Sequence, residues 1–370
     1  MNALGIIFSN IHDSNIPELT AERTMASIPF CGRYRLIDFA LSNMINSGIT
    51  KVGVITKSNY QSLMDHVGSG KDWDLARKNG GLMILPPFGV QENSMMYNTR
   101  LEALKGVSGF LKKSTQEYVI MSDSDAISSM DLEEILKYHN DNGADITMIY
   151  TVKNMKEISG KDNIILDVDG YGRVKGFEFN PVTSGNVNLY SNIMLIKRTF
   201  LLSLISESVA HGKRSFSRDV LAHNTESIRI FAYQYKGFMT TMSSLKNYYD
   251  VSMSMLNADI RQKLFKSSEV YTKTKDSTPT KYGANCVVKN SLIADGCIIE
   301  GEVYNSIIFR GVKISRGTVV KNSILMQDSI TGENVSLNAI ITDKDVVIRD
   351  GRQLSGCDNH PFFISKGSVI

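Results

Sequence analysis

The sequence predicts an α/β domain with a mostly parallel sheet, followed by a parallel β-helix. Two observations predict this order. In the first part of the chain, short apolar runs alternate with helical patterns, which is typical of βαβ units. In the last part, a short aliphatic block recurs at intervals of 15 to 17 residues, which is typical of a repeat architecture.

Four apolar runs are predicted as strands, and two periodic segments are predicted as helices. The strands are expected at Ala3–Phe8, Lys51–Thr56, Tyr118–Ser122 and Ala144–Thr151. The helices are expected at Arg35–Ser47, which has an apolar face, and at Asp131–His139. Sheets of this kind bind ligands at the carboxyl ends of their strands.

The repeats lie in the C-terminal part of the chain and contain two kinds of block. The Asn-led blocks begin at Asn290, Asn305, Asn322 and Asn338, and the partner blocks begin at Gly296, Gly311, Gly332 and Asp345. A stretch rich in Lys, Ser and Thr at residues 261–284 predicts a linker. We therefore assign residues 1–260 to the α/β domain and 285–370 to the β-helix. An antiparallel sandwich with a hairpin at Asp295-Gly296 is the alternative, but it gives no reason for the near-constant period.

The composition excludes several classes of protein. Hydrophobic residues make up 42% of the chain and charged residues 21%, as in ordinary globular proteins. The formal net charge of +3 is too small to indicate nucleic acid or a membrane as a partner. Four cysteines without zinc spacing favour a reducing compartment. With no signal-peptide pattern and no membrane-length apolar stretch, the expected location is the cytoplasm.

Residues 28–43, with the sequence IPFCGRYRLIDFALSN, resemble a segment of the bacterial glucose-1-phosphate adenylyltransferases. That family carries the similar segment PFGGKYRIIDFxLSN, and Asn46–Ile49 and Val52–Thr56 extend the similarity. The resemblance covers nearly the whole chain. It implies a Rossmann-like nucleotidyltransferase domain followed by a left-handed β-helix. The implied reaction converts ATP and glucose 1-phosphate to ADP-glucose and pyrophosphate in glycogen biosynthesis.

The phosphate-binding parts of such an enzyme have changed in this chain. The family's Gly-rich cradle, GGxGxR, falls on Asn10–Asn15, which contains no glycine and has Asn15 in place of the arginine. Asp13 would repel a polyphosphate there, at a cost on the order of 1–4 kcal/mol for charges about 4 Å apart. The family's phosphate-binding lysines fall on Met25 and Asn180, so each replacement removes a positive charge.

The metal and nucleobase sites implied by the resemblance have changed as well. The two metal-binding Asp residues of the family fall on Asp125 and Thr241, and Asp123 is an additional carboxylate nearby. Asp125 is equally compatible with a solvated turn, and one Asp is a poor Mg²⁺ site. Beside the nucleobase position, Thr99 replaces a glycine and Arg100 replaces a smaller residue. We therefore expect no bound cofactor, with Mg²⁺ only in an active partner subunit.

Some charged residues are retained at family positions. Arg23, Arg33 and Arg35 are candidates for an anion site, because effectors of the family are phosphorylated or carboxylate metabolites that bind near the domain junction. The alternative is structural, with Arg33 and Arg35 paired to Asp38 or other carboxylates. Asp219 lies in a segment that borders the family's sugar site, and it is either a substrate-side residue or half of an ion pair.

These losses predict a regulatory, catalytically inactive subunit of a glucose-1-phosphate adenylyltransferase. By resemblance, we expect a hetero-oligomer, and specifically a tetramer, with a catalytic subunit, and a small phosphorylated effector is possible. The apolar faces of Tyr304–Phe309 and Ile324–Met326 are expected to contact another subunit.

Three alternatives remain open. An active nucleotidyltransferase with a rebuilt phosphate site would form ADP-glucose alone. A stand-alone sensor of sugar phosphates or nucleotides would not co-purify with a catalytic subunit. A hexapeptide-repeat acyltransferase needs a general-base histidine on the β-helix, and the repeated blocks contain none.

Overall fold

Strand β1 (Ala3–Phe8) lies in the middle of a nine-stranded sheet in the N-terminal domain. The computed structural model describes residues 1–87, 97–158, 160, 162–266, 268–357 and 359–370. Strand β1 pairs in parallel with β4 (Lys51–Ile55) and β6 (Tyr118–Asp123), and β4 pairs in parallel with β5 (Gly81–Leu85). The carboxyl ends of these strands therefore meet at one edge, as the sequence predicts.

The other half of the sheet mixes directions. Strand β11 (Asn186–Lys197) runs antiparallel to both β6 and β8 (Ile146–Asn154), and β12 (Ile230–Gln234) is parallel to β8. Strands β9 (Ile164–Val168) and β10 (Val174–Phe179) form an antiparallel pair at the sheet's edge. Two short antiparallel pairs lie outside this sheet, namely β2 (Pro29–Phe30) with β3 (Tyr34–Arg35) and β7 (Ala126–Ser128) with β13 (Met239–Thr241).

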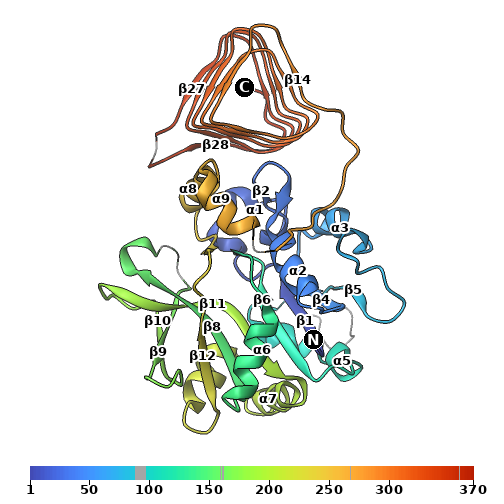
Figure 1. Ribbon diagram of the computed structural model, residues 1–370, viewed down its shortest axis with the longest axis vertical. Coiled ribbons are helices and arrows are strands. Elements are labelled where there is room, and N and C mark those ends of the chain that lie inside the picture. The colour runs from blue at the N-terminus through green and yellow to red at the C-terminus, as the bar shows by residue number, and fades with distance from the viewer. Residues whose placement is uncertain (88–96, 159, 161, 267, 358) are drawn as a thin grey trace.

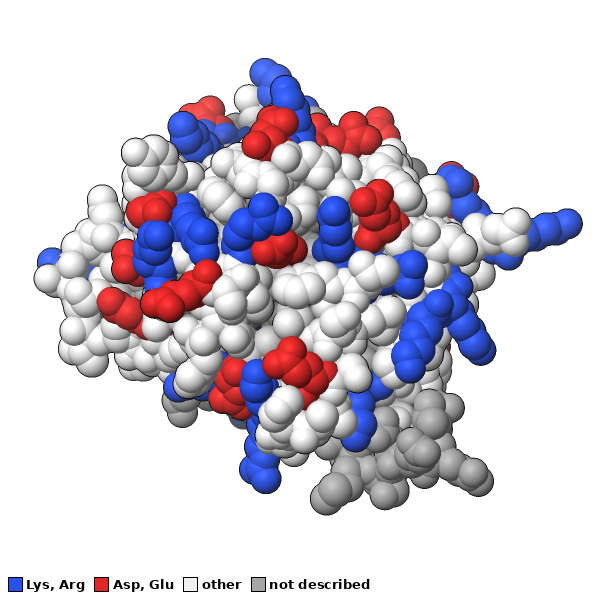
Figure 2. Space-filling model, turned by 90° about the horizontal axis from the view of Figure 1, so that it is seen from below, with Lys and Arg blue, Asp and Glu red and all other residues white. Residues whose placement is uncertain are grey.

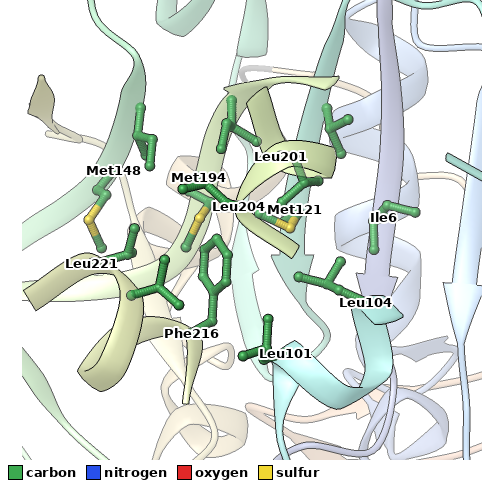
Figure 3. Close-up of a cluster of buried hydrophobic side chains, with 14 of the residues drawn as sticks. Ile6, Leu101, Leu104, Met121, Met148, Met194, Leu201, Leu204, Phe216 and Leu221 are labelled. Atoms are coloured by element: carbon green, nitrogen blue, oxygen red, sulfur yellow. The ribbon is translucent and has the colours of Figure 1, made fainter. Parts of the chain in front are cut away.

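Helices cover both faces of the sheet. Helices α4 (Arg100–Gly106), α5 (Ser108–Lys112) and α7 (Arg198–Ala210) pack on one face, and α2 (Leu36–Asn46), α3 (Gln61–Val67) and α6 (Leu132–Asp141) pack on the other. Helices α1 (Pro17–Thr20), α8 (Leu245–Ser254) and α9 (Ala258–Phe265) instead contribute to a core cluster shared with the β-helix. Alternate residues of β1 point to opposite faces. On one face, Ile6 packs with Leu101 and Leu104 of α4 and Leu201 of α7 (Figure 3). On the other, Ile7 packs in the cluster that contains residues of α2 and α6.

The C-terminal domain is a left-handed β-helix of three parallel five-stranded sheets, seen end-on as a triangle (Figure 1). The first sheet contains β14 (Lys281–Tyr282), β17 (Ile298–Ile299), β20 (Lys313–Ile314), β23 (Ile330–Thr331) and β26 (Val347–Ile348). The second contains β15 (Val287–Lys289), β18 (Glu302–Tyr304), β21 (Val319–Lys321), β24 (Ser336–Asn338) and β27 (Gln353–Ser355). The third contains β16 (Leu292–Ile293), β19 (Ile307–Ile308), β22 (Ile324–Leu325), β25 (Ile340–Thr342) and β28 (Phe362–Ile364). The parallel pairing excludes the antiparallel sandwich.

The corners of the β-helix show that one of the predicted partner blocks begins at a different residue. The register of the first sheet makes Gly296, Gly311, Asp328 and Asp345 equivalent, and all four have positive φ angles of 75°, 74°, 60° and 58°. The prediction that Gly332 begins the third partner block was therefore wrong. A corner of this kind needs a left-handed residue, and Asp adopts that conformation more readily than most other non-glycine residues.

The Asn-led blocks form a side-chain ladder along another corner. The Nδ2 of Asn290 donates to the Oδ1 of Asn305 (2.6 Å), Asn305 donates to Asn322 (2.8 Å), and Asn322 donates to Asn338 (3.0 Å). In the fourth coil the backbone position equivalent to Asn322 belongs to Ala339, which has φ 52°. The last predicted block is thus displaced by one residue, although Asn338 keeps its place in the ladder.

The third sheet of the β-helix packs against the chain's own α/β domain. Ile307, Phe309, Ile324 and Met326 are at most 1% exposed and share a core cluster with Tyr248 of α8. The prediction that these faces contact another subunit was therefore wrong. The expected linker at 261–284 begins inside α9 and ends after β14, so part of it belongs to the two domains.

Charged side chains of both signs are interspersed on the face of the α/β domain that lies opposite the β-helix (Figure 2). Across the described part of the chain, no helix combines the length and apolar character needed to cross a membrane.

Candidate functional site

The loop after β1 is held by its own polar side chains. Asn10 Oδ1 accepts hydrogen bonds from Thr56 Oγ1 (2.9 Å) and the Lys57 backbone N–H (3.0 Å), and Asn10 Nδ2 donates to Asp13 Oδ2 (2.6 Å). Asp13 Oδ1 accepts from the backbone N–H of Met25 (2.8 Å), whose side chain is 1% exposed in the core. The Asp13 carboxylate thus accepts a hydrogen bond from a backbone N–H that could otherwise donate to an anionic ligand.

Burial raises the pKa of Asp13 to about 6, although the hydrogen bonds from Asn10 and Met25 oppose this shift. Asp13 is therefore mostly ionised at neutral pH. Its negative charge lies within the segment that corresponds to the phosphate cradle, where a polyphosphate would be repelled.

Next to this loop, the ends of β1 and β6 place a histidine between two carboxylates. His12 Nε2 lies 2.6 Å from Asp123 Oδ2 and 3.7 Å from Asp125 Oδ2. Arg100 forms an ion pair with Asp123, with its Nε 3.2 Å from Asp123 Oδ1, and its Nη2 donates to Asn192 Oδ1 (2.9 Å). His12, Asp123 and Asp125 are at most 5% exposed. Because these groups are buried, their charges interact strongly.

The position of Arg100 follows from the local sequence. Thr99 caps α4, because its Oγ1 accepts from the Glu102 N–H (3.3 Å) while the Glu102 carboxylate accepts from the Thr99 N–H (3.3 Å). This capping box makes Arg100 the first residue of the helix. The guanidinium then reaches Asp123, the last residue of β6.

The cluster balances two cations against two carboxylates. Burial alone would lower the pKa of His12, but the charge of Asp125 and the hydrogen bond to Asp123 outweigh it and raise the pKa to about 9. Burial would raise the pKa of Asp123, but Arg100 and His12 hold it below its usual range. Burial raises the pKa of Asp125, although His12 opposes the shift. His12 is therefore an imidazolium at neutral pH.

These donors do not fit Mg²⁺. One ligand atom from each of His12, Asp123 and Asp125 lies within 4.8 Å of the others, but Mg²⁺ prefers octahedral oxygen coordination. Both oxygens of Asp123 already bind Arg100 and His12, and the imidazole nitrogen carries a proton. Among the described residues, Asp125 Oδ1 is a buried oxygen without a hydrogen-bond partner.

The structure brings three predicted site residues together. Asn15, Asp125 and Thr241 line one cavity of about 20 Å³ together with His12. Thr241 of β13 lies opposite Ala126 of β7, which directly follows Asp125. A cavity of this volume holds about one water molecule.

A second cavity, of about 190 Å³, is bordered by Arg100, Asn180 and Arg218. Asn180 has φ 52°, and its Oδ1 accepts from the Asn163 N–H (2.8 Å), so its amide closes a turn. The guanidinium of Arg218 lies 4.2 Å from the centroid of the Phe179 ring. Asn180 thus borders this cavity, and its amide oxygen is bound to a backbone N–H.

The carboxylate of Asp219 also binds backbone N–H groups. Its Oδ2 accepts hydrogen bonds from the N–H groups of Arg214 (2.9 Å) and Ser215 (2.8 Å), and these bonds hold the pKa of Asp219 below its usual range. The carboxylate therefore holds the start of the π-helical turn Phe216–Leu221. These partners are backbone N–H groups, so the geometry gives Asp219 a structural role that differs from the ion pair named as the alternative.

The three candidate arginines do not form one site. Arg23 is 2% exposed and pairs with Asp343 of the β-helix, with Nη2–Oδ1 and Nη2–Oδ2 distances of 2.8 and 2.9 Å. Arg35 Nη1 donates to Ser62 Oγ (2.9 Å). Arg33 is exposed and lines a different cleft. Arg23 and Arg35 thus lie near each other at the domain junction, and Arg33 lies apart.

Sequence analysis missed a lysine at this junction. Burial, together with repulsion from Arg35 and Arg23, lowers the pKa of Lys344 to about 7, although Asp343 opposes the shift. Burial also lowers the pKa of Arg35 to about 10. Only the packing of the β-helix on the loop after β1 brings these residues together, so no spacing in the sequence indicates the cluster.

Comparisons with known proteins agree with this architecture. Residues 14–258 match the family described as "Nucleotidyl transferase", and residues 276–369 match "GlmU-like, C-terminal hexapeptide". The chain is 33% identical to the glycogen biosynthesis protein GlgD of Bacillus subtilis (strain 168), over 99% of this chain and 96% of that protein. For the GlgD protein of Geobacillus stearothermophilus, the identity is 36% over 99% and 96%. For the glucose-1-phosphate adenylyltransferase of Thermosipho africanus (strain TCF52B), it is 30% over 86% and 78%.

The two matched regions define the class of the protein, which is a nucleotidyltransferase fold joined to a hexapeptide-repeat β-helix. The chain belongs to the family that comprises the glucose-1-phosphate adenylyltransferases and the glycogen biosynthesis proteins GlgD.

Proposed function

We propose that this chain is a regulatory, catalytically inactive subunit of a glucose-1-phosphate adenylyltransferase in glycogen biosynthesis. The observation that carries the proposal is the buried cluster of His12, Arg100, Asp123 and Asp125. Catalysis of phosphoryl or nucleotidyl transfer depends on positioned cations and metal ions around the phosphates. Here the positive charges at the ends of β1 and β6 are already bound to carboxylates of the chain.

The loop after β1 supports the same proposal. ATP would bring several negative charges to a segment that holds the ionised carboxylate of Asp13 and no glycine. Met25, at the position of a family lysine, is a core residue. Its side chain packs in the apolar cluster between the two domains, so a lysine there would bury its charge among apolar side chains.

The proposed partner is a catalytic adenylyltransferase subunit, in a hetero-oligomer that is by family resemblance a tetramer. The relatives support this pairing, because similarity over most of the chain extends both to proteins named GlgD and to proteins named as the enzyme. In the partner, Mg²⁺ would serve catalysis, while this chain would raise or tune activity. We place the complex in the cytoplasm, where its free thiols stay reduced.

The junction cluster supports a phosphorylated effector for this subunit. Arg35 and Lys344 are half-buried cations, and Arg23 is neutralised by Asp343. Lys344 stays partly neutral near pH 7 because Arg35 and Arg23 repel its charge. An anion bound between Arg35 and Lys344 would relieve this repulsion and link the two domains.

Co-expression tests the partnership. A tagged copy of this chain is co-expressed with an untagged catalytic adenylyltransferase subunit from the same organism. The tagged chain is purified by affinity chromatography, and the molar mass of the eluted material is measured by light scattering. We expect both chains to elute together with the mass of a mixed oligomer. Separate elution of the two proteins at micromolar concentrations would reject the partnership and favour the stand-alone sensor.

A further inference from the structure

The first sheet of the β-helix has an outer face with no role in the function proposed above. Its outward-pointing residues stand in register from coil to coil, in the row Lys281, Ile298, Lys313, Ile330, Val347 and Val369. The residues that alternate with them point inward, as do Ile299 and Ile348, which are at most 1% exposed. Figure 1 shows this sheet, which begins with β14, on a side of the triangle that does not face the α/β domain.

Most of this row is apolar. Ile330 and Val369 are 37% and 57% exposed, and Ile298 and Val347 are half-buried. The two lysines of the row are exposed. An exposed apolar strip with polar residues around it is typical of a surface that contacts another protein.

The corner that joins the first sheet to the second carries charges of both signs, and the coils are numbered here from the one that contains β14. Glu300 of the second coil and Arg349 of the fifth occupy equivalent positions, one residue after the inward-pointing row. Arg316 of the third coil and Glu333 of the fourth are also equivalent, two residues after that row. Arg316 Nε lies 3.9 Å from Glu300 Oε1, and the Arg316 side chain is 78% exposed. Such an exposed pair contributes little, so these charges remain available to a partner.

We propose that two copies of this chain associate through the outer faces of their first sheets, around a two-fold axis parallel to the strands. Such an axis keeps each position along a strand and reverses the order of the coils, which makes the interface self-complementary. With the axis between the third and fourth coils, Glu300 lies opposite Arg349 of the second copy, and Arg316 lies opposite Glu333 of the second copy. The symmetry repeats both contacts, so opposite charges meet along the whole corner.

The same symmetry brings apolar surfaces together. Ile298 would pack on Val347 of the second copy, and the aliphatic stem of Lys313 would lie along Ile330 of the second copy. The burial of these side chains supplies a favourable free energy that the charges alone do not. The remaining carboxylate of the corner, Asp350, already accepts a hydrogen bond from the Glu333 backbone N–H (2.8 Å).

Other symmetric arrangements of this face bring like charges together. An axis through the third coil would place Arg316 against Arg316 of the second copy, and an axis through the fourth coil would do the same for Glu333. An axis along the β-helix would exchange the two corners of the sheet and place Glu333 near Asp328 of the second copy. The charges therefore favour one register and disfavour its neighbours.

The contact is small, and it involves this chain alone. The row spans six coils, or roughly 24 Å at about 4.8 Å per strand, which is at the lower end for a specific interface. We therefore expect a weak dimer that salt weakens further, since its ion pairs are near the surface. Its absence would not bear on the partnership with a catalytic subunit, because that partnership does not depend on this face.

Sedimentation equilibrium of the full chain at low salt measures the association. We expect reversible dimers with a dissociation constant on the order of 50 μM. Arg316→Glu and Glu333→Arg each place like charges on the same contact, so each variant alone should dimerise at least tenfold more weakly than the wild type. Both side chains are exposed, so neither substitution disturbs the core.

An equimolar mixture of the two variants is the decisive arm. Every contact between an Arg316→Glu copy and a Glu333→Arg copy again joins opposite charges, so the mixture should recover the wild-type affinity. Lys321→Glu, which changes an exposed lysine on the outer face of the second sheet, is the control and should dimerise like the wild type. The proposal is overturned if the wild type stays monomeric, if either single variant dimerises normally, or if the mixture fails to recover.

Discussion

Arg23 of the α/β domain and Asp343 of the β-helix form a buried ion pair between residues 320 positions apart in the chain. The guanidinium is 2% exposed and the aspartate 4%. Such a pair adds little net stability compared with apolar residues, but removing one partner leaves the other charge buried and unpaired. The pair therefore makes the packing of the two domains depend on both residues being present.

Arg23→Ala is expected to lower the free energy of unfolding by about 3–5 kcal/mol, since Asp343 would remain buried without its partner. Urea unfolding followed by circular dichroism measures the change. Lys366→Ala is the matched control, because Lys366 pairs with Glu22 at the exposed surface (3.1 Å), where a pair contributes up to about 1 kcal/mol. Equal effects of the two substitutions would contradict the buried pair.

The histidine cluster predicts that the difference in unfolding free energy between the wild type and His12→Gln depends on pH. The folded-state pKa of His12 is about 9, above its ordinary value of 6.5, so its stabilising contribution is complete below pH 6.5 and disappears as pH rises through 9. This contribution is about 3 kcal/mol at most. The stability advantage of the wild type over His12→Gln should therefore shrink between pH 6.5 and 9.

The comparison must be made between variants, because Lys344 has the opposite effect. The folded-state pKa of Lys344 is about 7, below its ordinary value of 10.5, so stability rises with pH across that interval. The two slopes partly cancel in the wild type alone. The exposed His211 gives the control, His211→Gln, and a constant difference between wild type and His12→Gln at all pH values would contradict the raised pKa of His12.

The β-helix predicts a position that does not tolerate even one methyl group. A Cβ on Gly301 would lie 2.3 Å from the backbone oxygen of Thr318 and 2.8 Å from that of Ser315. Gly301→Ala should therefore destabilise the protein by about 1–3 kcal/mol, seen as a lower thermal midpoint. A Cβ on Gly170 would meet nothing within 4 Å, so Gly170→Ala should leave the midpoint unchanged; a drop of the same size in both would refute the steric argument.

The junction cluster predicts pH-dependent anion binding. Lys344 is charged below its pKa of about 7, so inorganic sulfate, which keeps its charge across this range, should bind more tightly at pH 6 than at pH 8.5, as measured by calorimetry. In Lys344→Gln, affinity at pH 6 should fall about tenfold and most of the pH dependence should disappear. Lys313→Gln, an exposed lysine of β20, is the control. Unchanged binding in Lys344→Gln would remove Lys344 from the anion site.

The parallel core could be predicted because its signal is local. Ala3–Phe8 is a continuous apolar run whose six residues are all buried in β1, and such runs are typical of strands covered on both faces. The repeat predicted the β-helix for the same reason. The register of the β-helix was harder to predict, because a corner requires a positive φ angle rather than one residue type. Asp328 and Ala339 adopt positive φ angles, although neither is glycine or asparagine.

The candidate site could be predicted only in part. Asn15, Asp125 and Thr241 do meet in one cavity, because they follow the family's order along the chain. The ion pairs that fill the site could not be predicted, since His12 and Asp123 are 111 residues apart and meet through the pairing of β1 with β6. Arg33 was grouped with Arg23 and Arg35 because all three stand at family positions, but a tight hairpin turns Arg33 to another face of the junction.

The most direct test of the proposed function is the rate of ADP-glucose synthesis by three preparations: this chain alone, the catalytic subunit alone, and the two co-expressed. We predict no synthesis by this chain alone, and a higher rate or an altered effector response in the mixture than in the catalytic subunit alone. Robust synthesis by this chain alone would contradict the account. It would mean that other groups replace the cations lost at Asn15, Met25 and Asn180, and the metal-binding carboxylate lost at Thr241.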